Sequence, residues 1–201
     1  MPFNHNDHYH PLLLRQVPAR ARTALDVGCG TGKFTRRLAA TGLAVEGVDP
    51  AREVIEAACA TSPGGITYRC EDITRAELPK GHYDFISCLA ALHHMPFETV
   101  TKLRRALAPG GVLAVLGLAL PSSAWDLGKW LLAAPLLNVP ARLVVAAGDR
   151  LNGGGDHVAV APVRDPDLSM AEVRRGSATL LPGSTVRTLL FWRYLLVYRA
   201  G

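Results

Sequence analysis

Residues 24–35, which read ALDVGCGTGKFT, constrain the fold more than any other stretch of this chain. An apolar run leads into a turn with glycines at alternate positions, Gly28, Gly30 and Gly32, and a helical pattern follows. A strand, a glycine-rich turn and a helix in this order place a ligand over the carboxyl ends of parallel strands. The segment therefore predicts a site for a nucleoside cofactor.

The spacing of the turn excludes two phosphate-binding motifs. A P-loop needs GxxxxGK followed by Ser or Thr, but Lys33 is followed by Phe34, and Val27 stands where the first glycine is required. The dinucleotide fingerprint GxGxxG needs its third glycine at position 33, whereas this chain has it at Gly32. The turn therefore fits neither phosphate site.

A ligand without a phosphate fits better, because glycines allow close backbone approach and positive φ. Asp26, two residues before the first glycine, is placed to help hold an ammonium group. Asp49, at the end of the next apolar run, is placed to accept hydrogen bonds from both ribose hydroxyls. S-adenosylmethionine joins an amino-acid tail to a ribose without a pyrophosphate, so it is the cofactor that we expect.

Strand and helix patterns alternate along most of the chain, which favours an α/β fold with a mostly parallel, doubly wound sheet. We expect strands at 23–27, 44–48, 66–70, 83–88, 112–118, 186–191 and 194–198, and helices at 32–41, 51–61, 96–107 and 168–179. The last two strands form an antiparallel pair in this prediction. Residues 1–201 are expected to be one domain, with a helical lead-in at 1–22 and an insertion at 121–162 that is too short for a core of its own.

Composition limits the partners. The net charge of +5 comes from scattered basic residues, so we expect no nucleic-acid partner. The segment 130–147 is apolar but interrupted by Pro, Asn and Arg, which argues against a membrane span. The four cysteines lack a CxxC spacing, and we interpret them as reduced, buried residues of a cytoplasmic protein. They are Cys29, Cys59, Cys70 and Cys88.

Five segments together make the chain resemble the class I S-adenosylmethionine-dependent methyltransferases. They are 25–32, 48–50, 70–73, 83–95 and 103–111, in the order and spacing of that family's motifs. The resemblance covers residues 23–120 closely and the C-terminal strand pair less closely. It implies a Rossmann-like, seven-stranded sheet of order 3-2-1-4-5-7-6 with the last strand antiparallel, and S-adenosylmethionine as cofactor.

The resemblance also implies which residues bind the cofactor. The first motif surrounds its methionine part, the acid at the end of the second strand binds the ribose, and Asp72 hydrogen-bonds the adenine amine, although Asp72 could instead only cap a turn. A lead-in helix often folds over the cofactor in such enzymes, which adds Tyr9 near the methionine carboxylate or the substrate. The expected set is Tyr9, Asp26, Gly28, Cys29, Gly30, Thr31, Gly32, Asp49, Pro50, Asp72, Ile73, Leu89 and His94.

Three histidines are candidates for a general base. His93 and His94 follow the fourth strand, where the family places its reaction centre, and His157 lies just after a glycine-rich loop. Histidine exchanges a proton near neutral pH, which suits proton removal from a phenol or an amine. The alternative is that one of the pair packs against the cofactor or a helix while the other faces solvent. We expect no metal, because no helical HxxxH pair or cysteine supports one.

The acceptor is expected to be a small molecule, since no RNA-binding module is added to the core. The insertion at 121–162 carries apolar side chains, so it is predicted to form a lid over an apolar or aromatic acceptor or, equally, a dimer face, and the protein is expected to be a monomer or a homodimer. The predicted reaction is methyl transfer to oxygen or nitrogen. Alternatives are a non-methylating cyclisation, elimination or rearrangement, and a non-catalytic cofactor-binding subunit.

Overall fold

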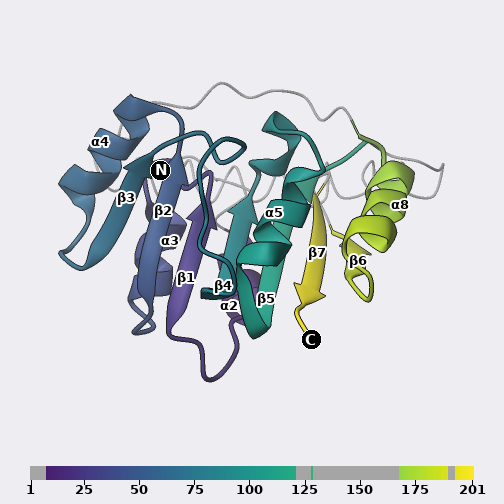
Figure 1. The fold of residues 1–201 in the computed structure, drawn as a ribbon. Helices are drawn as coiled ribbons and strands as arrows, with labels where there is room; N and C mark the ends of the chain where they lie inside the picture. Colours follow the sequence, from purple (N-terminus) through teal and green to yellow (C-terminus); the bar gives the residue numbers. More distant parts are fainter. Residues whose placement is uncertain (1–7, 121–127, 129–167, 190–192) are drawn as a thin grey trace.

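The computed structural model describes residues 8–120, 128, 168–189 and 193–201, and it contains a seven-stranded sheet (Figure 1). The strands are β1 (Thr23–Val27), β2 (Ala44–Asp49), β3 (Ile66–Cys70), β4 (Tyr83–Leu89), β5 (Leu107–Leu118), β6 (Thr185–Thr188) and β7 (Arg193–Arg199). Their order is β3-β2-β1-β4-β5-β7-β6, and β7 runs antiparallel to both of its neighbours while β1 to β5 are parallel. The predicted fold class, strand order and antiparallel strand are confirmed.

Helices lie on both faces of this sheet. Figure 1 shows α5 (Thr99–Ala106) and α8 (Met170–Leu180) in front of it, with α2 (His10–Leu14) and α3 (Lys33–Ala39) behind. Two further helices of the described residues are α4 (Arg52–Thr61), beside β2 and β3, and the short 3-10 helix η1 (Leu92–His94), which follows β4.

The core follows from the alternation of side chains along each strand. On one face Leu25 and Ile86 are fully buried in the cluster that includes α5 and α8. On the other face Ala24 and Phe85 are fully buried in the cluster that includes α2 and α3. β1 and β4 are buried on both faces, and they are mostly apolar apart from Asp26, Asp84 and Ser87, which is why the sequence identified them as strands.

The topology gathers the predicted site at one edge of the sheet. The chain leaves β1 toward β2 but leaves β4 toward β5, so the crevice between β1 and β4 is a topological switch point, where ligands bind in open α/β sheets. The glycine turn follows β1, Asp49 ends β2, and η1 follows β4. All three therefore lie at the carboxyl edge.

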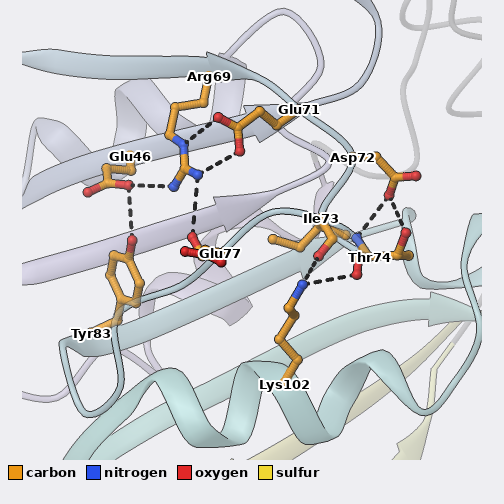
Figure 2. A network of polar contacts seen from close by, with 9 residues as sticks. All are labelled: Glu46, Arg69, Glu71, Asp72, Ile73, Thr74, Glu77, Tyr83 and Lys102. Carbon is orange, nitrogen blue, oxygen red and sulfur yellow. Dashed lines mark hydrogen bonds and ion pairs between the residues drawn. The ribbon is translucent and has the colours of Figure 1, made fainter.

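No α-helix joins β3 to β4, and polar side chains cover that part of the sheet instead (Figure 2). Arg69 pairs with Glu71 (Nη2 to Oε2, 2.6 Å) and with Glu46 (Nη1 to Oε2, 3.6 Å). The Tyr83 hydroxyl donates to Glu46 (2.9 Å). From α5, Lys102 donates to the carbonyl oxygens of residues 73 and 74 (2.9 and 3.0 Å), which ties the connection to the front layer.

Two of the cysteines correct the sequence-based expectation. All four are free thiols, and Cys29 and Cys88 are buried as predicted, but Cys59 and Cys70 are exposed. Cys59 lies on the outer side of α4, and Cys70 ends the edge strand β3, where one face meets solvent. Among the described residues, no helix has the length and apolar character of a membrane span.

Candidate functional site

The glycine turn has the backbone that its sequence demands. Gly28, Gly30 and Gly32 have φ of 68°, 52° and 74°, a region that other L-residues adopt only with strain. The N–H groups of residues 28 and 29 both donate to the carbonyl oxygen of Val48 (2.8 and 3.2 Å), so the turn is anchored to β2. The prediction of positive φ at these glycines is confirmed.

The three glycines differ in what surrounds them. A Cβ built on Gly28 would overlap the Ala91 side chain, and one built on Gly32 would overlap the Tyr68 hydroxyl. A Cβ on Gly30 meets nothing within 4 Å. Two of the glycines are therefore required by the protein's own packing, whereas Gly30 presents bare backbone to open space, as a ligand cradle should.

Asp49 joins the end of β2 to this turn. Its Oδ2 accepts a hydrogen bond from the Gly30 N–H (3.0 Å), and its Oδ1 accepts one from the Ala51 N–H (3.0 Å). A carboxylate offers about four acceptor positions, so both oxygens keep capacity for ribose hydroxyls. Pro50, beside it, is exposed. This half-buried carboxylate is where the sequence placed it, and its role toward a ribose stays a prediction.

The other residues of the turn stabilise it. Burial raises the pKa of the Cys29 thiol far above its ordinary value, so this cysteine is a neutral packing residue under assay conditions. The Thr31 carbonyl oxygen accepts a hydrogen bond from Arg36 Nη1 (2.8 Å) in α3. The Cys29 side chain therefore packs inside the protein, and the Thr31 carbonyl oxygen links the turn to α3.

Asp26 is buried beneath the turn, with 1% of its surface exposed. The Thr35 hydroxyl donates to Oδ2 (2.7 Å) and the Ser87 hydroxyl donates to Oδ1 (2.8 Å). Desolvation raises the Asp26 pKa to about 6, against the pull of both hydrogen bonds and with a further rise from the charge of Asp49. The role of Asp26 toward an ammonium group stays a prediction. Because the carboxylate is buried, Asp26 would attract the ammonium group by its charge and not by direct contact.

This pKa predicts a measurable effect of pH on stability. The folded protein holds the Asp26 proton up to about pH 6, whereas the unfolded chain loses it near pH 3.8, so stability falls as pH rises between these values. A pKa difference of about two units corresponds to about 3 kcal/mol, so above pH 6 the folded protein is less stable by about this amount than at low pH. Asp26→Asn keeps a partner for each hydroxyl and is expected to raise the melting temperature above wild type at pH 8 but not at pH 4. Calorimetric melts at both pH values measure it.

Asp72 occupies the turn after β3. Its Oδ1 accepts from the N–H and hydroxyl of Thr74 (2.9 and 2.8 Å), and these hydrogen bonds lower the Asp72 pKa. Figure 2 shows its second oxygen pointing away from that turn. Asp72 is exposed, so capping a turn and meeting an adenine amine are compatible. The Ile73 side chain is 4% exposed and belongs to the core.

The segment after β4 carries the two candidate bases. His93 and His94 lie in η1 with ring centroids 4.0 Å apart; His93 is half-buried and His94 is exposed. Leu89 is half-buried at the end of β4. Ala90 follows with a φ of 51°, the one positive value outside glycine among the described residues, and its N–H donates to Leu116 (2.7 Å). This strained residue turns the chain from β4 into η1.

The lead-in segment reaches the core. Tyr9 is 7% exposed and packs in the cluster behind the sheet, and His10 lies against Phe34 with ring centroids 4.8 Å apart. Tyr9 also lies near Arg193, the first residue of β7, and burial lowers the pKa of the Arg193 side chain.

His157 and the insertion 121–162, apart from residue 128, lie outside the described residues. Within the described ranges, no group of His, Cys, Asp or Glu is arranged to hold a metal ion.

Sequence reasoning missed four residues that shape this site. Ser87 and Thr35 hold Asp26, Tyr68 packs against Gly32, and Ala91 packs against Gly28. Polar Ser87 inside the apolar strand 83–89 was a readable signal, because a buried hydroxyl needs a partner. The contacts of Tyr68 and Ala91 carry no signal in the sequence, since neither residue is near its glycine along the chain.

The known proteins that this chain resembles are methyltransferases. A family model described as a methyltransferase domain matches residues 25–115. A methyltransferase of Mycobacterium bovis is 36% identical over 211 aligned positions, covering 99% of this chain and 98% of that protein. A ubiquinone biosynthesis O-methyltransferase of Coxiella burnetii is 31% identical over 104 positions, covering 49% of this chain and 44% of that protein. An S-adenosylmethionine-dependent methyltransferase of Mesorhizobium loti has the same fold, with a TM-score of 0.64 at 16% identity, over 96% of this chain and 99% of that one.

Proposed function

The chain belongs to the class I S-adenosylmethionine-dependent methyltransferases, and from that premise we propose that it methylates an oxygen or nitrogen atom of a small, apolar or aromatic acceptor. The observation that carries this proposal is the carboxyl edge of the sheet. There the bare backbone of Gly30, the Asp49 carboxylate and the η1 histidines lie at or just after the carboxyl ends of three neighbouring strands. Such an edge fits a nucleoside on one side and an acceptor on the other.

The residues present fit the cofactor of this family. Gly30 leaves room for close approach, Asp49 has acceptor capacity for a ribose diol, and the buried Asp26 adds negative charge under the turn. In this proposal the glycine turn with Cys29 and Thr31 surrounds the methionine part, Asp49 and Pro50 meet the ribose, Asp72 and Ile73 border the adenine, and Leu89, His94 and Tyr9 close the site. When bound, S-adenosylmethionine supplies a methyl group that is already activated on a sulfonium.

Because the donor is activated, the chain's own contribution is mainly positioning. The strained turn at Ala90 aims η1 at the edge where the donor lies, and the exposed imidazole of His94 is available to take a proton from an acceptor. His93 packs against it and is the second candidate, followed by His157. A hydroxyl acceptor needs such a base more than a neutral amine does.

His94→Ala is expected to lower kcat with a phenolic acceptor by about 100-fold, a larger effect than its change in the KM for the donor. His82→Ala is the matched control, because His82 is also exposed but lies at the opposite, amino end of β4. Steady-state rates with both variants test the assignment. Full activity of His94→Ala together with a strong loss in His93→Ala would move the role of base to the neighbouring residue.

The acceptor class rests on two supports. The apolar sequence of the insertion 121–162 suits a lid over an apolar acceptor. The similarity of about half of this chain to a ubiquinone biosynthesis O-methyltransferase supports oxygen as the acceptor atom. We treat the chain as one cytoplasmic domain, monomeric or homodimeric. The proposal is tested by incubating the protein with S-adenosylmethionine and a panel of phenols, carboxylic acids and amines. The amount of S-adenosylhomocysteine formed is compared with the amount of product. Equal amounts support methyl transfer, whereas product without S-adenosylhomocysteine would indicate a cyclisation, elimination or rearrangement.

A further inference from the structure

A buried hydrogen-bonded group, Asp26 with the hydroxyls of Thr35 and Ser87, lies beside the glycine turn. Asp26 accepts from Thr35 Oγ1 at 2.7 Å and from Ser87 Oγ at 2.8 Å. The exposed fractions are 1% for Asp26 and 0% for both hydroxyl residues. An aspartate this deeply buried is unusual and needs compensation for the lost hydration.

The three residues come from three elements that converge behind the turn. Asp26 is on β1, Ser87 is its register partner on β4, and Thr35 is in the first turn of α3. Each hydroxyl has one proton to donate, and both are aimed at the carboxylate rather than elsewhere. Ser87 Oγ also lies 3.4 Å from the Leu25 carbonyl oxygen, but that contact is longer than its 2.8 Å contact with Asp26. Two donors on two carboxylate oxygens favour the ionised form.

We propose that Thr35 and Ser87 are positioning residues for cofactor binding: their hydroxyl protons keep Asp26 ionised beneath the glycine turn, so that its charge attracts the ammonium end of S-adenosylmethionine. The inference rests on the assignment of the cofactor to this edge of the sheet. Because Asp26 is 1% exposed, its charge acts across the thin backbone of the turn, where the low polarity of the interior screens it weakly.

The ionisable groups that interact electrostatically with Asp26 lie on β2, on β4 and in the glycine turn. Asp49, at the end of β2, adds a second negative charge and raises the Asp26 pKa. Burial raises the pKa of Cys88 on β4 to about 12 and that of Cys29 in the turn further, so both thiols stay neutral. With its own pKa near 6, Asp26 changes charge within the pH range that a binding assay can cover.

The test is a calorimetric titration with S-adenosylhomocysteine between pH 5 and pH 8.5. Wild-type affinity is expected to be flat above pH 7 and to fall below pH 6, by up to about tenfold per pH unit. Thr35→Val and Ser87→Ala each remove one donor, which shifts this midpoint upward by about one unit. Their affinity is then about fivefold below wild type at pH 6 and within about twofold of it at pH 8.5. Thr35→Ser keeps the hydroxyl and is expected to retain the wild-type midpoint.

Two outcomes would overturn the inference: the same loss of affinity at every pH in Thr35→Val and Ser87→Ala, or an unchanged midpoint in both. A second measurement needs only the wild-type protein, in case these variants fold poorly. Titration at pH 5.5 in buffers of different ionisation enthalpy should show release of roughly three quarters of a proton on binding. No release would also contradict the inference. Absence of any S-adenosylhomocysteine binding at pH 8.5 would contradict instead the cofactor assignment on which it rests.

Discussion

Asp49→Ala is expected to weaken S-adenosylhomocysteine binding by about 100-fold. The Asp49 carboxylate keeps acceptor capacity on both oxygens while it holds the N–H groups of Gly30 and Ala51. A hydrogen bond to a charged group contributes about 1.5–3 kcal/mol, so losing two to a ribose costs at least about 3 kcal/mol, or two orders of magnitude in Kd. Calorimetric titration at pH 8 measures the change.

Asp84→Asn is the matched control for this prediction. It also removes one negative charge, but at the amino ends of the strands. There Asp84 accepts hydrogen bonds from the N–H groups of Arg22 and Thr23 (2.7 and 3.1 Å). We expect it to lower the melting temperature and to leave the Kd unchanged. Equal Kd values for wild type and Asp49→Ala would remove Asp49 from the site.

Gly28→Ala and Gly30→Ala are expected to fail in different ways. At Gly28 the new methyl group overlaps Ala91 and the backbone has a φ of 68°, so overpacking and left-handed strain add to about 2–5 kcal/mol of lost stability. At Gly30 the methyl group meets no protein atom within 4 Å, so stability falls by only about 1–2 kcal/mol. The same methyl group lies where the cofactor should approach, and Kd rises by at least about tenfold.

Urea unfolding and calorimetric titration of both variants separate these effects. Gly30→Ala should unfold close to the wild-type midpoint while binding S-adenosylhomocysteine poorly. Gly28→Ala should unfold at a much lower urea concentration. Wild-type affinity in Gly30→Ala would show that this part of the turn does not face the cofactor.

The central strands β1, β4 and β5 were predictable because they are buried, and the edge strand β3 because a strong turn signal precedes it. β1 and β3 begin and end at the residues expected from the sequence, and the strand order follows from a family resemblance spread over five segments. The glycine turn was predictable for a local reason, since each positive φ demands glycine in the sequence itself.

Contacts between distant segments could not be predicted in this way. Ser87 reaches Asp26 across 61 positions of sequence, and although a hydroxyl in an apolar strand signals that it needs a partner, the sequence does not say which residue that partner is. The same holds for Tyr68 over Gly32 and Ala91 over Gly28, the contacts by which two of the three glycines serve packing inside the protein. The exposed Cys59 and Cys70 were wrongly expected to be buried because cysteine is a buried residue on average, and an edge strand and an outer helix face override that average.

We propose that the turn at residues 28–32 holds a phosphate-free aminoacyl nucleoside. Calorimetric titration of the wild-type protein with S-adenosylhomocysteine, NAD and ATP in parallel tests it most directly. We predict one S-adenosylhomocysteine bound per chain, with NAD and ATP at least about 100-fold weaker because the turn lacks the spacing of a phosphate site. No heat with S-adenosylhomocysteine, or equal affinity for NAD or ATP, would contradict the claim.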